Sequence, residues 1–143
     1  MFETTMLSKD FFDKYYNKMM EYASYCEGKR YLVNNNTFFC NMIVKEDSTV
    51  GFPDWERSGV CDFLLDFAIM DLNKPYLMIP EKLYEYFKKK GISVEHFHER
   101  FLCMAYYKGI ATLMWHASID DEESCLSIMK SISELEERIK AIK

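Results

Sequence analysis

The stretch that decides the fold runs from residue 31 to residue 56 and reads YLVNNNTFFCNMIVKEDSTVGFPDWE. It opens on a short β-prone run at 31–33, which leads into a loop that is first polar and then aromatic. Two further β-prone runs, 42–44 and 50–52, flank a polar turn, a pattern that predicts a small β-hairpin. The stretch therefore predicts a strand, a loop and a hairpin.

Segments with helical spacing of apolar residues surround this stretch on both sides. Helices are predicted over 8–27 (with Ser8 as the N-cap), 62–71, 80–90, 94–117 and from Asp120 onward. The helix over 94–117 is apolar on nearly every side, so it is expected to be central, with Gly109 in close contact with a neighbour. The predicted fold class is α+β, mostly helical, in one domain spanning residues 1–143.

Composition and charge exclude several classes of protein. A chain of 143 residues with 49% hydrophobic residues fits one globular domain. The net charge of −5 and the lack of a basic face argue against nucleic-acid binding. No apolar run reaches the length of a membrane span. The five cysteines contain no C-x-x-C pair, and we expect free thiols in a reducing cytoplasm.

Three asparagines and one aspartate carry a resemblance to a known family. Kinases of the aminoglycoside phosphotransferase family have a strand, a loop of the type His-(Gly/Ala)-Asp-x-x-x-x-Asn, a hairpin, and an apolar pair followed by Asp-Trp. Here Asn34 stands at the His position, Asn36 at the Asp position and Asn41 at the Asn position. Asp54 stands at the metal-binding Asp position. The chain resembles the C-terminal lobe of this family, in particular its hygromycin phosphotransferase branch, over most of its length.

The resemblance implies a protein-kinase-like C-terminal lobe. Residues 31–56 would form the catalytic loop and the hairpin that bears the metal site, and residues 57–143 a helical subdomain. The resemblance also implies ATP and Mg²⁺ as cofactors, with Asn41 and Asp54 as metal ligands. Their oxygen atoms are of the kind that Mg²⁺ prefers.

Asn36 departs from the family at the catalytic position. A carboxamide has no accessible pKa and cannot act as a general base, and loss of that help costs about 10²–10⁴-fold in rate. Two later acids, Asp62 and Asp66, keep the spacing of the family's Gly-Asp-x-x-x-Asp pattern, with the glycine replaced by Cys61. We expect these two acids to hold the backbone near the loop rather than to react.

The family's ATP-covering lobe marks a second departure. In the family an N-terminal β lobe supplies a phosphate loop and a lysine paired with a glutamate. Here seven residues precede Ser8 and no G-x-G-x-x-G run occurs, so the chain is expected to be a truncated form that binds Mg²⁺ and ATP weakly or not at all. The acids Asp120, Asp121, Glu122 and Glu123 suit the start of a helix. The resemblance alternatively implies that these acids line a site for cationic sugars.

Three functions stay open at this point. The chain resembles antibiotic-resistance kinases, but the departures favour an inactive, pseudokinase-like lobe. It could instead be an interaction module that dimerises or docks on a partner protein, through the apolar side around Phe38, Phe39 and Phe52 that an N-lobe would cover. The third alternative is an active phosphotransferase completed by a separately encoded N-lobe. The sequence leaves the substrate and the oligomeric state undetermined.

Overall fold

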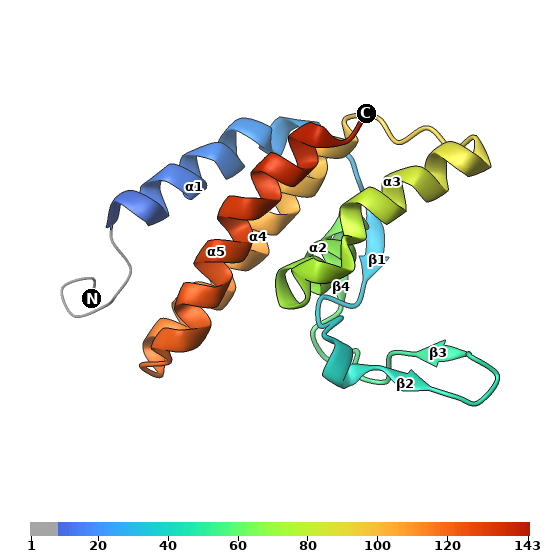
Figure 1. The fold of residues 1–143 in the computed structure, drawn as a ribbon, viewed down its shortest axis with the longest axis horizontal. Coiled ribbons are helices and arrows are strands. Elements are labelled where there is room, and N and C mark those ends of the chain that lie inside the picture. Colours follow the sequence, from blue (N-terminus) through green and yellow to red (C-terminus); the bar gives the residue numbers. More distant parts are fainter. Residues whose placement is uncertain (1–8) are drawn as a thin grey trace.

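Helices form most of the described chain, which comprises residues 9–143 of a computed structural model (Figure 1). Ser8, the predicted cap of the first helix, lies outside the described residues. The α-helices are α1 (Lys9–Tyr22), α2 (Leu64–Asn73), α3 (Ile79–Lys90), α4 (Phe97–Ser118) and α5 (Glu122–Ala141). Short 3-10 helices span Ala23–Cys26, Phe39–Asn41 and Pro75–Leu77. The predicted mostly helical α+β class is confirmed.

The ends of the helices follow from local chemistry. Gly91 ends α3 in a left-handed conformation (φ 65°), which glycine adopts without steric cost. His96 is also left-handed (φ 51°), so α4 begins at Phe97, later than predicted. Asp121 caps α5 by accepting a hydrogen bond from the backbone N–H of Ser124 at 3.1 Å. The last helix therefore starts just after the predicted residue.

The strands form two small antiparallel pairs. Strand β2 (Ile43–Val44) pairs with β3 (Val50–Gly51), which confirms the predicted hairpin. This hairpin projects away from the helices in Figure 1. Strand β1 (Tyr31–Val33) pairs with β4 (Gly59–Cys61), a strand that the sequence analysis missed, since helix was expected soon after Asp54. Three residues are too few to show the alternation that identifies a strand.

Helix α4 forms the centre of the fold and packs against α1, α2 and α5 (Figure 1). Its residues Phe101, Ala105 and Tyr106 are fully buried. Gly109 lets α5 approach closely, because a Cβ atom there would lie 2.6 Å from Cδ1 of Ile132. The predicted central helix and the close contact at Gly109 are both found. No helix within residues 9–143 is both long enough and apolar enough to cross a membrane.

Two arginines form ion pairs that connect the helices. Arg100 on α4 donates to both carboxylate oxygens of Asp62, at 2.7 and 2.9 Å. Arg138 on α5 donates to Asp71 on α2 at 2.9 and 3.0 Å and to Glu81 on α3 at 2.8 Å. These bidentate pairs set the positions of four helices relative to one another, because each guanidinium bonds in a fixed planar geometry.

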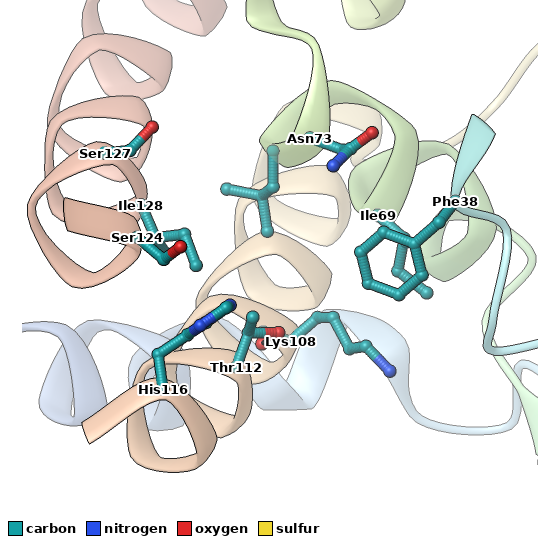
Figure 2. A pocket seen from close by; sticks show the side chains of 10 residues that line it. Phe38, Ile69, Asn73, Lys108, Thr112, His116, Ser124, Ser127 and Ile128 are labelled. Atoms are coloured by element: carbon teal, nitrogen blue, oxygen red, sulfur yellow. Dashed lines mark hydrogen bonds between the residues drawn. The ribbon is translucent and has the colours of Figure 1, made fainter. Parts of the chain in front are cut away.

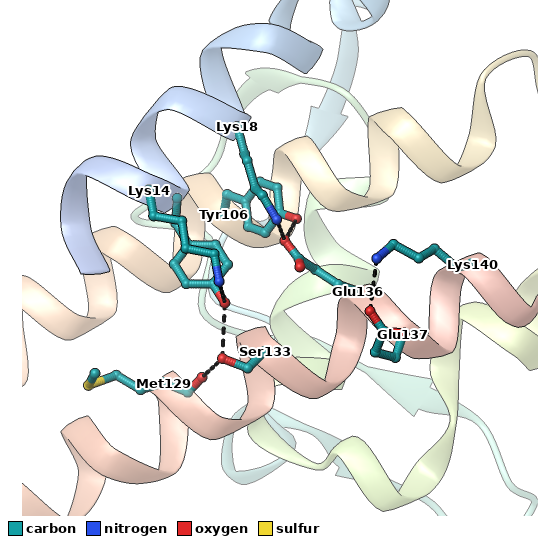
Figure 3. A network of polar contacts seen from close by, with 9 residues as sticks. Lys14, Lys18, Tyr106, Met129, Ser133, Glu136, Glu137 and Lys140 are labelled. Atoms are coloured by element: carbon teal, nitrogen blue, oxygen red, sulfur yellow. Dashed lines mark hydrogen bonds and ion pairs between the residues drawn. The ribbon is translucent and has the colours of Figure 1, made fainter. Parts of the chain in front are cut away.

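A polar network joins α1 and α4 to α5 (Figure 3). Glu136 on α5 accepts hydrogen bonds from Lys18 on α1 and from Tyr106 on α4. The hydroxyl of Tyr15 on α1 lies 3.0 Å from Oγ of Ser133 on α5. The buried tyrosines thus find partners for their hydroxyl groups within an otherwise apolar interface.

Candidate functional site

Asp66, in the first turn of α2, holds the loop that follows β1. Its carboxylate accepts the backbone N–H of Asn34 at 2.9 Å and that of Asn35 at 2.8 Å. Its backbone carbonyl accepts the hydroxyl of Thr37 at 2.7 Å. This is the backbone-holding role that the family resemblance implied for Asp66, and it sets the conformation of residues 34–37.

The turn of this loop is also fixed from α4. Asn35 has a left-handed backbone (φ 59°), and the ammonium of Lys108 donates to its backbone carbonyl and to its Oδ1, both at 3.0 Å. Burial lowers the pKa of Lys108, and the positive charge of Arg57 adds to this effect. Sequence reasoning missed Lys108. The signal was present, since Lys108 is the single charged residue between Phe101 and Trp115.

The loop and the hairpin bring the predicted site residues together. The side-chain amide of Asn36 donates to Oδ2 of Asp54 at 2.6 Å. The amide of Asn41 donates to the backbone carbonyl of Asn36 at 3.1 Å, and that of Asn34 donates to the carbonyl of Asp54 at 2.6 Å. Asn36, Asn41 and Asp54 line one cavity of about 580 Å³. Residues distant in sequence thus meet at one surface hollow, which we call the loop cavity.

The donor atoms of the loop cavity fit a divalent cation only in part. Asn41 directs its amide nitrogen to the backbone carbonyl of Asn36, and its Oδ1 accepts a hydrogen bond from the thiol of Cys40 at 3.7 Å. Asp54 supplies a carboxylate, but Oδ2 already accepts the Asn36 amide. Within residues 9–143 no three His, Cys, Asp or Glu side chains are grouped as a metal site would require. A hard cation would rest on one amide oxygen and one shared carboxylate.

A second hollow of about 220 Å³ adjoins the loop cavity, and we call it the helix cavity (Figure 2). It lies between α2, α4 and α5. Four residues line both hollows: Phe38, Lys108, Thr112 and His116. The remaining lining residues of the helix cavity are Ile69, Leu72, Asn73, Ser124, Ser127 and Ile128. Only tertiary packing assembles this set, so sequence reasoning did not find it.

The acidic run at the start of α5 lies outside the lining of both hollows. Asp121 caps the helix, and its Oδ2 lies 2.9 Å from Nδ1 of His116. The hydrogen bonds from Ser124 hold the pKa of Asp121 below its usual value, with a smaller contribution from His116. Asp120, Glu122 and Glu123 are exposed. The helix-start reading of this run agrees with the geometry, and its substrate-binding role stays a prediction.

Comparisons by sequence identify no relative. No protein-family model matches the chain, and a search of curated proteins finds no match.

Comparison by structure identifies the fold. The crystal structure of aminoglycoside phosphotransferase APH(4)-Ia matches with a TM-score of 0.74 and 15% identity, over 95% of this chain and 46% of that chain. A thermostable mutant of that enzyme, in ternary complex with AMP-PNP and hygromycin B, matches with a TM-score of 0.74 and 17% identity, over 99% of this chain and 48% of that chain. The chain thus spans about half the length of these structures.

These matches place the fold in the kinase-like class. More particularly, the fold is that of the C-terminal lobe of an aminoglycoside phosphotransferase. The resemblance that was read from the loop and hairpin is confirmed at the level of the fold.

Proposed function

We propose that this chain is a kinase-type lobe that does not transfer a phosphoryl group by itself. The observation that carries the proposal is the hydrogen bond from the amide of Asn36 to the carboxylate of Asp54. The family resemblance puts the catalytic base and a metal ligand at these two positions. In this chain the catalytic position holds Asn36, and its amide donates a hydrogen bond to one of the two carboxylate oxygens of Asp54.

The chemistry at Asn36 supports loss of activity. Phosphoryl transfer depends on positioning the attacking hydroxyl and on neutralising the phosphate charge. An amide nitrogen cannot accept the proton of a hydroxyl. Its N–H also draws electron density from Asp54, which weakens that carboxylate as a cation ligand.

The expected cofactors fit the same picture. Mg²⁺ would be held by Oδ1 of Asn41 and by Asp54, and ATP bound with it would supply the phosphoryl group. Mg²⁺ is usually held by one or two carboxylates together with substrate phosphates. Because residues 9–143 build no β lobe over the loop cavity, little holds those phosphates in place. Weak binding of Mg·ATP follows.

Replacing Asn36 by Asp tests the proposal directly. The Asn36→Asp variant should bind Mn²⁺, a stand-in for Mg²⁺, at least about tenfold more tightly than the natural chain, because a second carboxylate joins Asp54. Electron paramagnetic resonance of free Mn²⁺ measures the affinity. Asn17→Asp adds the same charge on the exposed side of α1 and should leave the affinity unchanged.

The gain should vanish in the double variant Asn36→Asp, Asp54→Ala. Equal Mn²⁺ affinity of the natural chain and Asn36→Asp would show that the amide does not limit the site. Phosphorylation of hygromycin B by the natural chain with ATP would refute the proposal outright. Such turnover would instead support an antibiotic-resistance function for this lobe by itself.

A specific surface favours a second candidate function, a protein-interaction module. Strand residues expose large apolar side chains, with Leu32 70% and Val60 66% exposed opposite each other across β1 and β4. Ile43 and Val44 on the hairpin are also exposed. Exposed apolar side chains of this kind favour association where they gather into a patch. The strands carry this surface, whereas Phe38, Phe39 and Phe52, where it was expected, are only partly exposed.

We propose that two copies of the chain associate through these strands. Sedimentation equilibrium should show a dimer that Leu32→Lys disrupts, because a charge there would be buried at the interface. Ile119→Lys, at an exposed site just after α4, is the matched control and should leave the dimer intact. A monomer at high concentration would exclude self-association.

The five free cysteines agree with the cytoplasmic location that we also propose.

A further inference from the structure

The helix cavity has a charge pattern that points to a ligand of a particular kind. We infer that it binds a small organic anion with an apolar body, such as an aromatic carboxylate. This binding would not require phosphoryl transfer, so it can be tested separately from the proposed function.

Among residues 9–143, the ionisable groups that line the helix cavity are Lys108 and His116, and no carboxylate lines it. Figure 2 shows the His116 ring pointing toward the middle of the hollow, whereas the Lys108 side chain runs away from His116 and ends below Phe38. His116 uses Nδ1 toward Asp121, which leaves Nε2 for a ligand. The carboxylate nearest His116, that of Asp121, lies outside the lining, against Nδ1 of the ring. An anion inside the hollow would therefore meet basic groups and be attracted.

The Lys108 ammonium has a hydrogen-bond donor left for an anion. The ammonium has three hydrogens, and hydrogen bonds to Asn35 O and Oδ1 use two of them. Burial and the charge of Arg57 lower the pKa of Lys108, against a smaller opposing effect of Asp66. A bound carboxylate would offset this unfavourable charge and would take the third hydrogen in a charge-assisted hydrogen bond.

The rest of the lining suits an apolar body with a polar end. The walls consist of Phe38, Ile69, Leu72 and Ile128. Asn73 and the hydroxyls of Ser124 and Ser127 lie around the rim (Figure 2). Mostly apolar lining with a few placed polar groups is the usual make-up of small-molecule sites. A carboxylate at Lys108 would leave the apolar part of the ligand against these walls.

The same geometry disfavours a polycationic sugar. The acids that could neutralise such a sugar lie elsewhere, with Asp121 occupied by His116 and the cap of α5. In the adjoining loop cavity, Asp54 and Glu56 are matched by Arg57 and Lys108. Taken together, the two hollows offer no excess of negative charge.

Three ligands of one shape and different charge test the inference. Phenylacetate, phenylacetamide and phenethylamine are titrated into the full chain, and amide chemical shifts in NMR report both affinity and location. Phenylacetate should bind best and should shift the signals of residues such as Thr112, Ser127 and Ile128. Phenethylamine and hygromycin B should bind at least about tenfold more weakly. Tighter binding of either cation, or no detectable binding of phenylacetate, would overturn the inference.

Substitutions in the lining test whether phenylacetate binds in the helix cavity. Lys108→Met should reduce the affinity for phenylacetate roughly tenfold, since a hydrogen bond to a charged partner is lost. Lys130→Met, at an exposed lysine of α5, is the control for loss of charge. Because Lys108 also holds Asn35, Ser127→Phe provides a second test that fills the hollow from its exposed rim, with Lys130→Phe as its control. Unchanged binding in Ser127→Phe, or equal affinity for inorganic phosphate alone, would contradict the inferred site.

Discussion

Arg100 and Asp62 form a bidentate ion pair where strand β4 meets helix α2, and their side chains are 3% and 0% exposed. Asp62 also accepts the backbone N–H of Leu64 at 3.1 Å, which satisfies a donor at the start of α2. The pair therefore joins the strands and α2 to the central helix.

Removing one partner of this pair should destabilise the fold severely. Asp62→Ala leaves the Arg100 guanidinium buried without an anion, which should cost about 3–5 kcal/mol in the free energy of unfolding. Urea denaturation measures the loss. Glu85→Ala breaks the exposed Lys89–Glu85 pair and should change stability little. Similar small losses in both variants would show that the buried pair does not hold the fold together.

Changing Asp66 should loosen the loop without unfolding the helices. In Asp66→Asn an amide group faces one of the two backbone N–H groups that the carboxylate accepts, at Asn34 or Asn35. The lost hydrogen bond should cost about 1–3 kcal/mol. Hydrogen exchange at these two amides should become faster, while exchange in α4 stays slow. Asp13→Asn, on α1, is the control, and undiminished protection of the loop would count against this role of Asp66.

Gly109 should tolerate no side chain while Ile132 is present. The Cβ of Gly109→Ala would lie 2.6 Å from Cδ1 of the fully buried Ile132. Overpacking costs about 1–3 kcal/mol, against a helix-propensity gain of about 1 kcal/mol. A net loss of stability is expected, measured by thermal unfolding.

The matched test of this contact is a double-mutant cycle. Ile132→Val removes the clashing methyl group, so the two changes together should destabilise less than their sum. Simple additivity of the two losses would mean that Ile132 moves aside freely.

The Glu136 network should make stability depend on pH in the acid range. Burial alone would raise the pKa of Glu136, but hydrogen bonds from Lys18 and Tyr106 and the charge of Lys18 outweigh it, so the pKa is lowered from 4.5. A carboxyl with a depressed folded-state pKa stabilises the fold fully above its unfolded-state value, and this contribution is lost as the pH falls through the folded-state value.

This contribution should be present at neutral pH and should fade below about pH 4.5. Denaturant melts between pH 7 and pH 3 measure the slope. Glu136→Gln should flatten the acid limb, because the titrating group is gone, whereas the exposed Glu134→Gln should not. An identical slope in Glu136→Gln would assign the acid sensitivity to other carboxyls.

Much of the fold could be read from short-range patterns. The spacing of apolar residues marked the helices, and the turn between two β-prone runs marked the hairpin. These features depend on residues that are close in sequence. Strand β4 could not be found in this way, because it exists through its pairing with β1, more than twenty residues earlier.

The candidate site, like the fold, could be predicted from the sequence only in part. The family resemblance of residues 31–56 implied that Asn41 and Asp54 lie together, and both line one cavity with Asn36. The spacing could not show that the Asn36 amide bonds to Asp54, since that depends on the direction of a side chain. Lys108 lies far from the loop in sequence, and only the packing of α4 beneath it brings the ammonium to Asn35.

The sequence by itself determined the class of fold and the presence of an amide, not a carboxylate, at position 36, because both are properties of residue type and spacing. Only the tertiary structure decided what surrounds that position: a hydrogen bond to Asp54, a half-buried lysine, and a helix cavity whose lining, within residues 9–143, includes no acid. The physical reason is that charge and hydrogen bonding act through space. The charges and hydrogen bonds around position 36 come from residues that are remote along the chain, and packing alone brings those residues together.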